Sequence, residues 1–334
     1  MVKKITSGLF YCFFCLFFSG NLYAGSYIKL VSDTPLSRKA DTDKTRAYRI
    51  INRDFNAIYT QNLMPATFGQ EFFDPNKTLL VSNLVANFVV FNDPRFPVFF
   101  VVTPRIDIRL FSAFGSPVKS PSYMPGATLY FRTNRDSYNP DFFSVSYTHH
   151  SNGIRGPTLN PNGTFNTDSG KFTTNFYTLT FHTGKRTDKE DIIINRYDAL
   201  GVDLYSALVG LGYSHALEGK YGFVRVNGQW IYNISRANPD PIDKGKKNFQ
   251  NWQRIQFDFQ YIADKYDDYS SFDFKKRLNL TLKYYYQFPF MQNVSFYVGA
   301  GYRAQDEYNI FFQDTYPYVM AGLASGLSFG IHQN

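Results

Sequence analysis

The sequence predicts an all-β protein, a twelve-stranded antiparallel transmembrane β-barrel of the bacterial outer membrane. Three observations predict this fold class. Aromatic residues make up 19% of the chain, with 35 Phe and 26 Tyr. After the N-terminal segment, no apolar run approaches the roughly eighteen residues that a membrane-spanning helix needs. Apolar and polar residues instead alternate in segments of about ten residues, as in strands that face lipid on one side and a polar interior on the other.

The N-terminus has the features of a secretory signal peptide. A basic start at Lys3 and Lys4 precedes an apolar run from Leu9 to Phe18, and Ala24 is a small residue after which we expect cleavage. The run is too short for a comfortable transmembrane helix. We therefore expect three parts: a signal peptide at 1–24, a polar N-terminal extension or partial plug at 25–53, and the transmembrane β-barrel at 54–334.

The cysteines and the net charge exclude several classes of protein. Cys12 and Cys15 lie inside the signal peptide, so the mature chain is not a small domain stapled by disulfides. The formal charge of +8 falls to +6 when Lys3 and Lys4 are removed. A basic surface favours lipopolysaccharide or anionic lipid headgroups. No stripe of basic and aromatic residues indicates a nucleic-acid partner.

Twelve alternating segments are candidate strands. In 254–261 the odd-numbered residues are apolar and the even-numbered residues are polar, and 277–288 shows the opposite phase. The candidates are 54–63, 79–92, 97–112, 124–134, 141–151, 173–183, 201–214, 220–233, 251–263, 276–288, 293–304 and 317–330.

The connections between these segments differ in length. Long ones are expected at 152–172, 184–200, 234–250 and 305–316. Outer-membrane barrels have short periplasmic turns and long external loops, so we expect 113–123, 152–172 and 234–250 to lie outside. The alternative fold is a two-sheet β-sandwich, which would not require the aromatic excess.

A histidine and a serine occupy neighbouring positions on one row of the segment 141–151. Odd-numbered residues from 143 to 147 are apolar, and His149 and Ser151 continue that row. Residues i and i+2 of a strand share a face, so this pair suits a general base and a nucleophile that face lipid. Asn175 is an isolated amide on the apolar row of the next strand. The three polar groups would satisfy one another there, as in a serine hydrolase with an amide in place of the carboxylate.

The alternative reading is that these polar residues mark where the strand leaves the membrane. His150 alternates to the other face and does not join the row. The remaining histidines, His182, His215 and His332, lie on other strands or at the terminus. Scattered histidines in a mature chain without cysteine predict no transition-metal cluster.

The residues around this pair resemble the outer-membrane phospholipase A family. The family's Tyr-X-His-X-Ser-Asn-Gly core is matched from Tyr147 to Gly153, and its Pro-Thr pair is matched by Pro157 and Thr158. Upstream, the family's Ser-Pro-Phe-Arg-X-X-X-Tyr-X-Pro is similar to 116–125. The resemblance covers about residues 110–182, and only the pattern of strands extends it further.

The resemblance implies a phospholipase with A1 and A2 activity on phospholipids of the outer leaflet. It implies that Ser151 is the nucleophile, His149 the general base and Asn175 the residue that orients the imidazole. The Ser151 amide and a calcium-polarised water would stabilise the oxyanion. It also implies a homodimer that holds Ca2+ between protomers, with the Ser116 hydroxyl from one and the Ile154 carbonyl from the other.

This chain departs from the family pattern in two places. Leu159 replaces a serine ligand after the Pro-Thr pair, so either Asn160 substitutes as a calcium ligand or the site is weaker or absent. The loop after the serine is longer than the family's, and Asn160, Asn162 and Asn166 are rivals to Asn175 as the orienting residue. A non-catalytic barrel, either a pore or an inactive relative, is therefore the alternative function. A lipopolysaccharide deacylase would use similar chemistry on another substrate.

Overall fold

The structure is a computed structural model of the chain. It describes residues 65–75, 77–92, 96–112, 121–134, 136, 138–205, 215–239, 247–288, 290–291, 294–304, 315–325 and 331–332. The expected signal peptide, the polar extension and the expected strand at 54–63 lie outside the described residues. Within the described ranges, no helix combines the length and the apolar character needed to cross a membrane.

The described chain consists mainly of β-strands, which confirms the predicted all-β class. Its helical segments are the short turns η2 (His215–Leu217) and α3 (Phe274–Arg277). The strands are β1 Ala66–Phe72, β2 Thr78–Val85, β3 Phe88–Asn92, β4 Val98–Thr103, β5 Arg105–Phe111, β6 Ser122–Tyr123, β7 Gly126–Arg132, β8 Asp141–Thr148, β9 Phe176–Asp188, β10 Ile192–Tyr205, β11 Val224–Pro239, β12 Lys247–Ile262, β13 Leu278–Tyr286, β14 Val294–Arg303, β15 Tyr316–Ser325 and β16 Ile331–His332.

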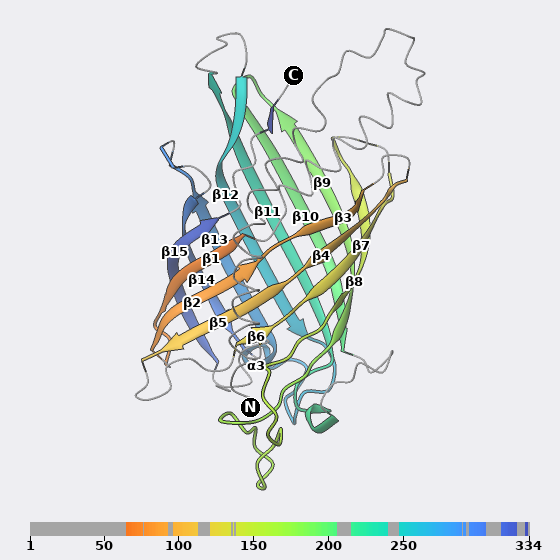
Figure 1. The fold of residues 1–334 in the computed structure, drawn as a ribbon, viewed down its shortest axis with the longest axis vertical. Helices are drawn as coiled ribbons and strands as arrows, with labels where there is room; N and C mark the ends of the chain where they lie inside the picture. The colour runs from red at the N-terminus through yellow and green to blue at the C-terminus, as the bar shows by residue number, and fades with distance from the viewer. Residues whose placement is uncertain are drawn as a thin grey trace, which may run out of the picture. The chain divides into compact units, whose positions relative to one another are not determined.

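These strands form one antiparallel sheet (Figure 1). Its order is β3-β4-β7-β8-β9-β10-β11-β12-β13-β14-β15-β1-β2-β5-β6, and β16 pairs with β12. Neighbours in the chain are mostly neighbours in the sheet. The longest strands, β9 to β12, lie side by side in the middle of this order.

Three neighbouring strands are each interrupted once. Ala86 and Asn87 separate β2 from β3, Pro104 alone separates β4 from β5, and Met124 and Pro125 separate β6 from β7. The pairing register before each gap continues unchanged after it. Proline lacks a backbone N–H and cannot donate to a strand ladder, which explains two of the interruptions. Two of the predicted strands, 79–92 and 97–112, are therefore each present as two elements, and β6 precedes the predicted strand 124–134.

The predicted long loop at 184–200 is wrong. Strand β9 continues to Asp188 and β10 begins at Ile192, so the connection is a tight turn at 189–191. The charged residues in this stretch belong to strands that continue beyond their apolar portions. None of the predicted strands covers β1.

The predicted placement of 234–250 at the same end of the sheet as 152–172 is wrong as well. Strand β10 ends beside the start of β11, where the Tyr205 N–H donates to the Phe223 carbonyl at 2.8 Å. Because the strands are antiparallel, β11 then runs to Pro239 at the opposite end from the loop that follows β8. Most of the expected external loop 113–123 lies outside the described residues, but its last residues, in β6, are at the same end of the sheet as 152–172, since Tyr123 is bridged to Ser151.

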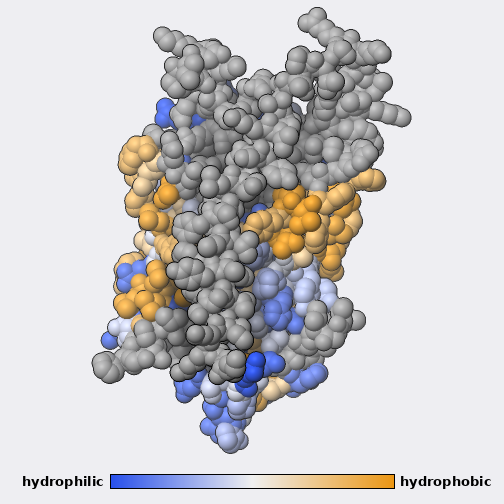
Figure 2. All heavy atoms as spheres, in the orientation of Figure 1, coloured by the Kyte–Doolittle hydropathy of each residue, from blue (hydrophilic) through white to orange (hydrophobic). Residues whose placement is uncertain are grey.

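The two faces of the sheet differ in exposure and composition. On β8, Phe142 and Ser144 are buried, whereas Phe143 between them is 36% exposed. The exposed face carries large apolar side chains on most strands, and Figure 2 shows hydrophobic residues gathered over the strands. They include Phe68, Leu79, Phe143, Leu179, Phe181, Leu200, Ile255, Leu282, Phe296, Val298, Val319 and Leu323.

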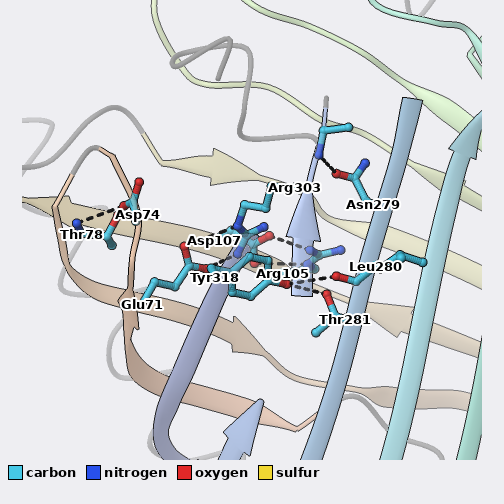
Figure 3. Close-up of polar contacts among 11 residues, drawn as sticks. Glu71, Asp74, Thr78, Arg105, Asp107, Asn279, Leu280, Thr281, Arg303 and Tyr318 are labelled. Atoms are coloured by element: carbon cyan, nitrogen blue, oxygen red, sulfur yellow. Dashed lines mark hydrogen bonds and ion pairs between the residues drawn. The ribbon is translucent and has the colours of Figure 1, made fainter. Parts of the chain in front are cut away.

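The buried face is rich in paired polar groups (Figure 3). Arg303 of β14 forms an ion pair with Glu71 of β1, and its guanidinium lies 4.5 Å from the ring centre of Tyr318. Arg105 and Asp107 pair at 2.6 Å on β5. Buried charges are tolerated only when they are paired and hydrogen-bonded. The sheet therefore has an apolar exposed face, and its buried face carries many charged and polar side chains beside aromatic clusters such as that of Phe99 and Phe142.

Candidate functional site

His149 and Ser151 lie just beyond the end of β8. The chain remains extended there, and Ser151 forms bridges with Tyr123 on one side and Thr173 on the other. The Tyr123 N–H donates to the Ser151 carbonyl at 2.8 Å, and the Ser151 N–H donates to the Tyr123 carbonyl at 3.0 Å. Ser151 therefore occupies the middle position of three paired segments, which fixes its backbone from both sides.

The pairing register places Asn175 opposite His149. Thr148 pairs with Phe176 at the end of β8, and Ser151 pairs with Thr173. The residues between these two pairs follow the same register, which puts His149 opposite Asn175. Next to His149 and Asn175, a backbone hydrogen bond joins His150 to Thr174, and two residues further on another joins Asn152 to Phe172. His149 and Asn175 therefore occupy a non-hydrogen-bonded position, where side chains of an antiparallel pair lie closest. The structure brings the three predicted residues to one strand end.

The direction of the row ending in His149 agrees with the prediction, whereas the surroundings of Asn175 differ from it. Phe143, Leu179 and Phe181 are exposed, and His149 and Ser151 are half-buried. Asn175 was expected as an isolated amide on that exposed face, but it is only 2% exposed. Its carboxamide oxygen accepts the backbone N–H of His150 at 3.2 Å. An amide at the edge of an apolar surface is stabilised by such a partner.

The side chains of the three residues do not yet form a hydrogen-bonded triad. In the part of the chain that the structure describes, no hydrogen bond joins the side chains of His149 and Ser151. The Ser151 N–H, expected to bind an oxyanion, is engaged by the Tyr123 carbonyl. Catalytic hydrogen bonds are often loose before substrate binds. A role of the Ser151 N–H in an oxyanion hole would require its release from the Tyr123 carbonyl.

Asn152 anchors the loop that follows the serine. It is 3% exposed, its amide group donates to the Gly170 carbonyl at 2.8 Å, and its side-chain oxygen accepts the Phe172 N–H at 3.0 Å. The next residue, Gly153, has a φ of +71°, a conformation that favours glycine. In the sequence, Asn152 stood out only as part of a motif. The Asn-Gly pair at the start of a long loop is the signal that could have revealed its anchoring role.

The loop asparagines are engaged within the loop itself. The Asn160 amide donates to the Thr164 hydroxyl at 3.0 Å and to the Phe165 carbonyl at 3.2 Å. The Asn162 side-chain oxygen accepts the Thr164 N–H at 3.1 Å, and the Asn166 amide donates to the Pro157 carbonyl at 3.0 Å. These contacts place the rivals within a small local hairpin, and the register favours Asn175 opposite the histidine.

The expected calcium ligands are only partly described. Ser116 lies outside the described residues. Ile154 and Asn160 belong to the loop after the serine, where Asn160 is exposed and Leu159 pairs with Phe165. Within the described ranges, no group of three or more His, Cys, Asp or Glu could hold a metal ion.

A second serine–histidine pair lies on the buried face of β8 and β9. The Ser144 hydroxyl is 2.7 Å from Nε2 of His182, and the Tyr197 hydroxyl contacts Nδ1 of the same ring. All three side chains are buried, with 3%, 8% and 9% exposed. The sequence analysis treated His182 as ordinary, because the pairing register of β8 and β9 was unknown.

Comparisons with known proteins give only distant similarities. No family model and no curated protein matches the sequence. The structure is similar to outer membrane phospholipase A from Escherichia coli, with a TM-score of 0.45 and 13% identity over 78% of this chain and 95% of that chain. It is similar to the Salmonella typhi outer membrane phospholipase dimer with bound calcium, with a TM-score of 0.45 and 12% identity over 78% and 89% of the chains. It is also similar to the NanC porin, with a TM-score of 0.36 and 9% identity over 79% and 99%. At these values the similarities do not define the family or the activity of the chain.

Proposed function

We propose that this chain is an outer-membrane β-barrel that hydrolyses acyl esters of phospholipids. The observation that carries the proposal is the meeting of His149, Ser151 and Asn175 at one strand end, beside an exposed apolar face. A base, a nucleophile and an orienting amide are the groups that serine hydrolysis requires. Their position at the edge of an apolar surface suits a substrate that arrives from a lipid layer.

The strands form a closed barrel if the two parts of each interrupted strand are counted as one strand. The pairs β2/β3, β4/β5 and β6/β7 continue in unbroken register, so they act as three strands. Setting β16 aside, twelve strands then remain, each paired with the next, and β15 pairs with β1. A closed antiparallel ring leaves no free edge, as a structure that crosses a membrane by strands requires. The apolar exposed face would contact lipid, and the polar buried face would fill the interior.

The proposed reaction proceeds in two steps. The Ser151 hydroxyl attacks the ester carbonyl while His149 takes its proton, and the lysophospholipid leaves with that proton from the imidazolium. Water then attacks the acyl-enzyme, and His149 again accepts and returns a proton, which releases the fatty acid and restores the serine. Asn175 orients the imidazole. The exposed residues Phe143 and Leu179 would contact the acyl chains.

Only some of the residues at the expected calcium site could bind the ion. We propose that Ser116, the Ile154 carbonyl and Asn160 would hold Ca2+ between two protomers of a homodimer. These are hard oxygen donors, and the Asn160 amide hydrogens are already used within the hairpin, so its carboxamide oxygen is the group that would bind. When bound, Ca2+ would polarise a water near the oxyanion. Leu159 offers no ligand, so we expect the site to be weak.

A micelle assay tests the proposal. Purified, detergent-folded protein is mixed with phospholipid micelles in calcium or in chelator, beside Ser151→Ala. We expect the wild type to release fatty acid and Ser151→Ala to release none, with a lower wild-type rate in chelator. Absence of hydrolysis by well-folded wild type at any calcium level would contradict the proposal.

The alternative is a non-catalytic barrel, either a pore or an inactive relative. Leu159 and the engagement of the Ser151 N–H by Tyr123 favour it. The buried face argues against a wide channel, because Arg225, Arg254 and Gln256 are all buried there. A steady conductance in planar bilayers, together with absent hydrolysis, would support the pore.

A further inference from the structure

His150, which lies between the proposed catalytic residues His149 and Ser151, points to the other face of the strand. His150 is 5% exposed and Thr174 is 1% exposed. The Thr174 hydroxyl lies 2.6 Å from Nδ1 of His150, and the Thr174 N–H donates to the His150 carbonyl at 3.0 Å. One side-chain and one backbone hydrogen bond therefore tie the two strand ends together on the buried face.

The same two residues hold Asn175. The His150 N–H donates to the Asn175 carboxamide oxygen at 3.2 Å, and Asn175 follows Thr174 directly in the chain. The carboxamide opposite His149 is thus fixed by the peptide of His150, and the His150 ring is fixed by Thr174. Side-chain networks that are fully hydrogen-bonded and buried are rigid, so they define the position of the groups attached to them.

We propose that His150 and Thr174 are positioning residues for ester hydrolysis at Ser151. Their hydrogen bond on the buried face sets the place of Asn175, and through it the orientation of the His149 imidazole. The inference rests on the proposed function. Displacements of about 1 Å in a catalytic group reduce rates by as much as roughly a hundredfold, so a small loosening has a measurable effect.

Thr174→Val tests the inference because it replaces the hydroxyl by a methyl group of similar size. We expect kcat per folded molecule to fall by roughly ten- to a hundredfold, with KM changed by less than about twofold. Thr174→Ser should restore most of the rate. The matched control is Thr178→Val, four residues along the same row of β9, where the hydroxyl donates to Asp203 at 2.7 Å away from the site. That control should keep the wild-type kcat.

The split between kcat and KM supplies a readout that general destabilisation would not move. Asn175→Ala should lower kcat at least as far as Thr174→Val, with KM changed by less than about twofold. Thr178→Val should leave both constants unchanged.

Hydrogen exchange at the His150 amide separates this inference from the proposed function. We expect faster exchange of that amide in Thr174→Val than in Thr178→Val. An active wild type with unchanged kcat in Thr174→Val would overturn the positioning role while leaving the phospholipase intact. Equal losses in the two variants would overturn it as well. A wild type without hydrolysis would overturn both, and the exchange rates would then report only on a structural anchor.

Discussion

Strands β8 and β9 carry two serine–histidine pairs, one on each face, and the two pairs differ in every property that matters for reactivity. On the buried face, Ser144 and His182 are joined at 2.7 Å, and Tyr197 binds the other ring nitrogen. At the strand end, His149 and Ser151 are half-buried and continue the exposed, apolar row. The hydrogen-bonded network is buried, whereas the more exposed pair is not joined by a hydrogen bond.

If Ser151 is the nucleophile, as we propose, hydrogen-bond geometry alone would select the wrong pair. A buried hydroxyl and imidazole must satisfy each other because no water reaches them, so good geometry there is a condition of folding. A catalytic serine must be accessible to the ester substrate. The hydrogen bonds of its hydroxyl are therefore completed only when substrate binds. Access distinguishes the two sites, and three predictions test the distinction.

The largest expected effect separates the two serines. Ser151→Ala should reduce phospholipid hydrolysis by at least about a thousandfold, since removal of a catalytic nucleophile costs that much or more. Ser144→Ala, the matched change on the buried face, should keep the rate per folded molecule within about twofold. Rates are measured in mixed micelles after the folded fraction is determined. A loss in Ser144→Ala alone would reverse the assignment of the reactive pair.

A smaller effect is expected on stability from the buried pair. His182→Leu leaves the hydroxyls of Ser144 and Tyr197 without their ring partner, and each such buried group costs roughly 1–3 kcal/mol. Urea unfolding in lipid vesicles should show this loss, while kcat per folded molecule stays unchanged. The control is His215→Leu, an exposed histidine paired with Glu218 at 2.9 Å, for which we expect little change. Equal destabilisation by both variants would contradict a network role for His182.

The smallest effect concerns the proposed calcium site, which lies in the loop after Ser151. Asn160→Ala should raise the calcium concentration for half-maximal hydrolysis by about tenfold, because it removes one oxygen ligand. Asn162→Ala alters the same exposed hairpin without removing a proposed ligand, and it should leave the calcium requirement unchanged. Calcium titrations of the hydrolysis rate check both variants. Identical curves for Asn160→Ala and wild type would remove Asn160 from the proposed site.

Strand positions were predictable where the sequence alternates between the two faces. In β12, Arg254 and Gln256 are buried and Ile255 between them is 42% exposed, as the alternation of 254–261 predicts. The same rule failed in 184–200, where Lys185 and Arg196 face each other across paired strands. The alternation of apolar residues ends where the apolar surface ends, although the backbone pairing continues.

The candidate site was predictable only in part. Spacing along one strand predicted that His149 and Ser151 share a row, and the exposure of Phe143 confirms the direction of that row. Asn175 lies across a long loop, so its register with His149 depended on pairing that the sequence does not specify. For the same reason, the contacts of Asn175 with His150 and of Ser144 with His182 were not foreseen.

The strand interruptions line up across the sheet. In register, Ala86 faces Pro104, Pro104 faces Pro125, and Pro125 faces His149, so the gaps form one line. The two prolines on that line donate no backbone hydrogen bond, but their carbonyls still accept one each, from the Ala86 N–H at 3.1 Å and from the His149 N–H at 3.0 Å. The strand ladder is therefore joined by fewer hydrogen bonds along this line, and His149 lies at its end.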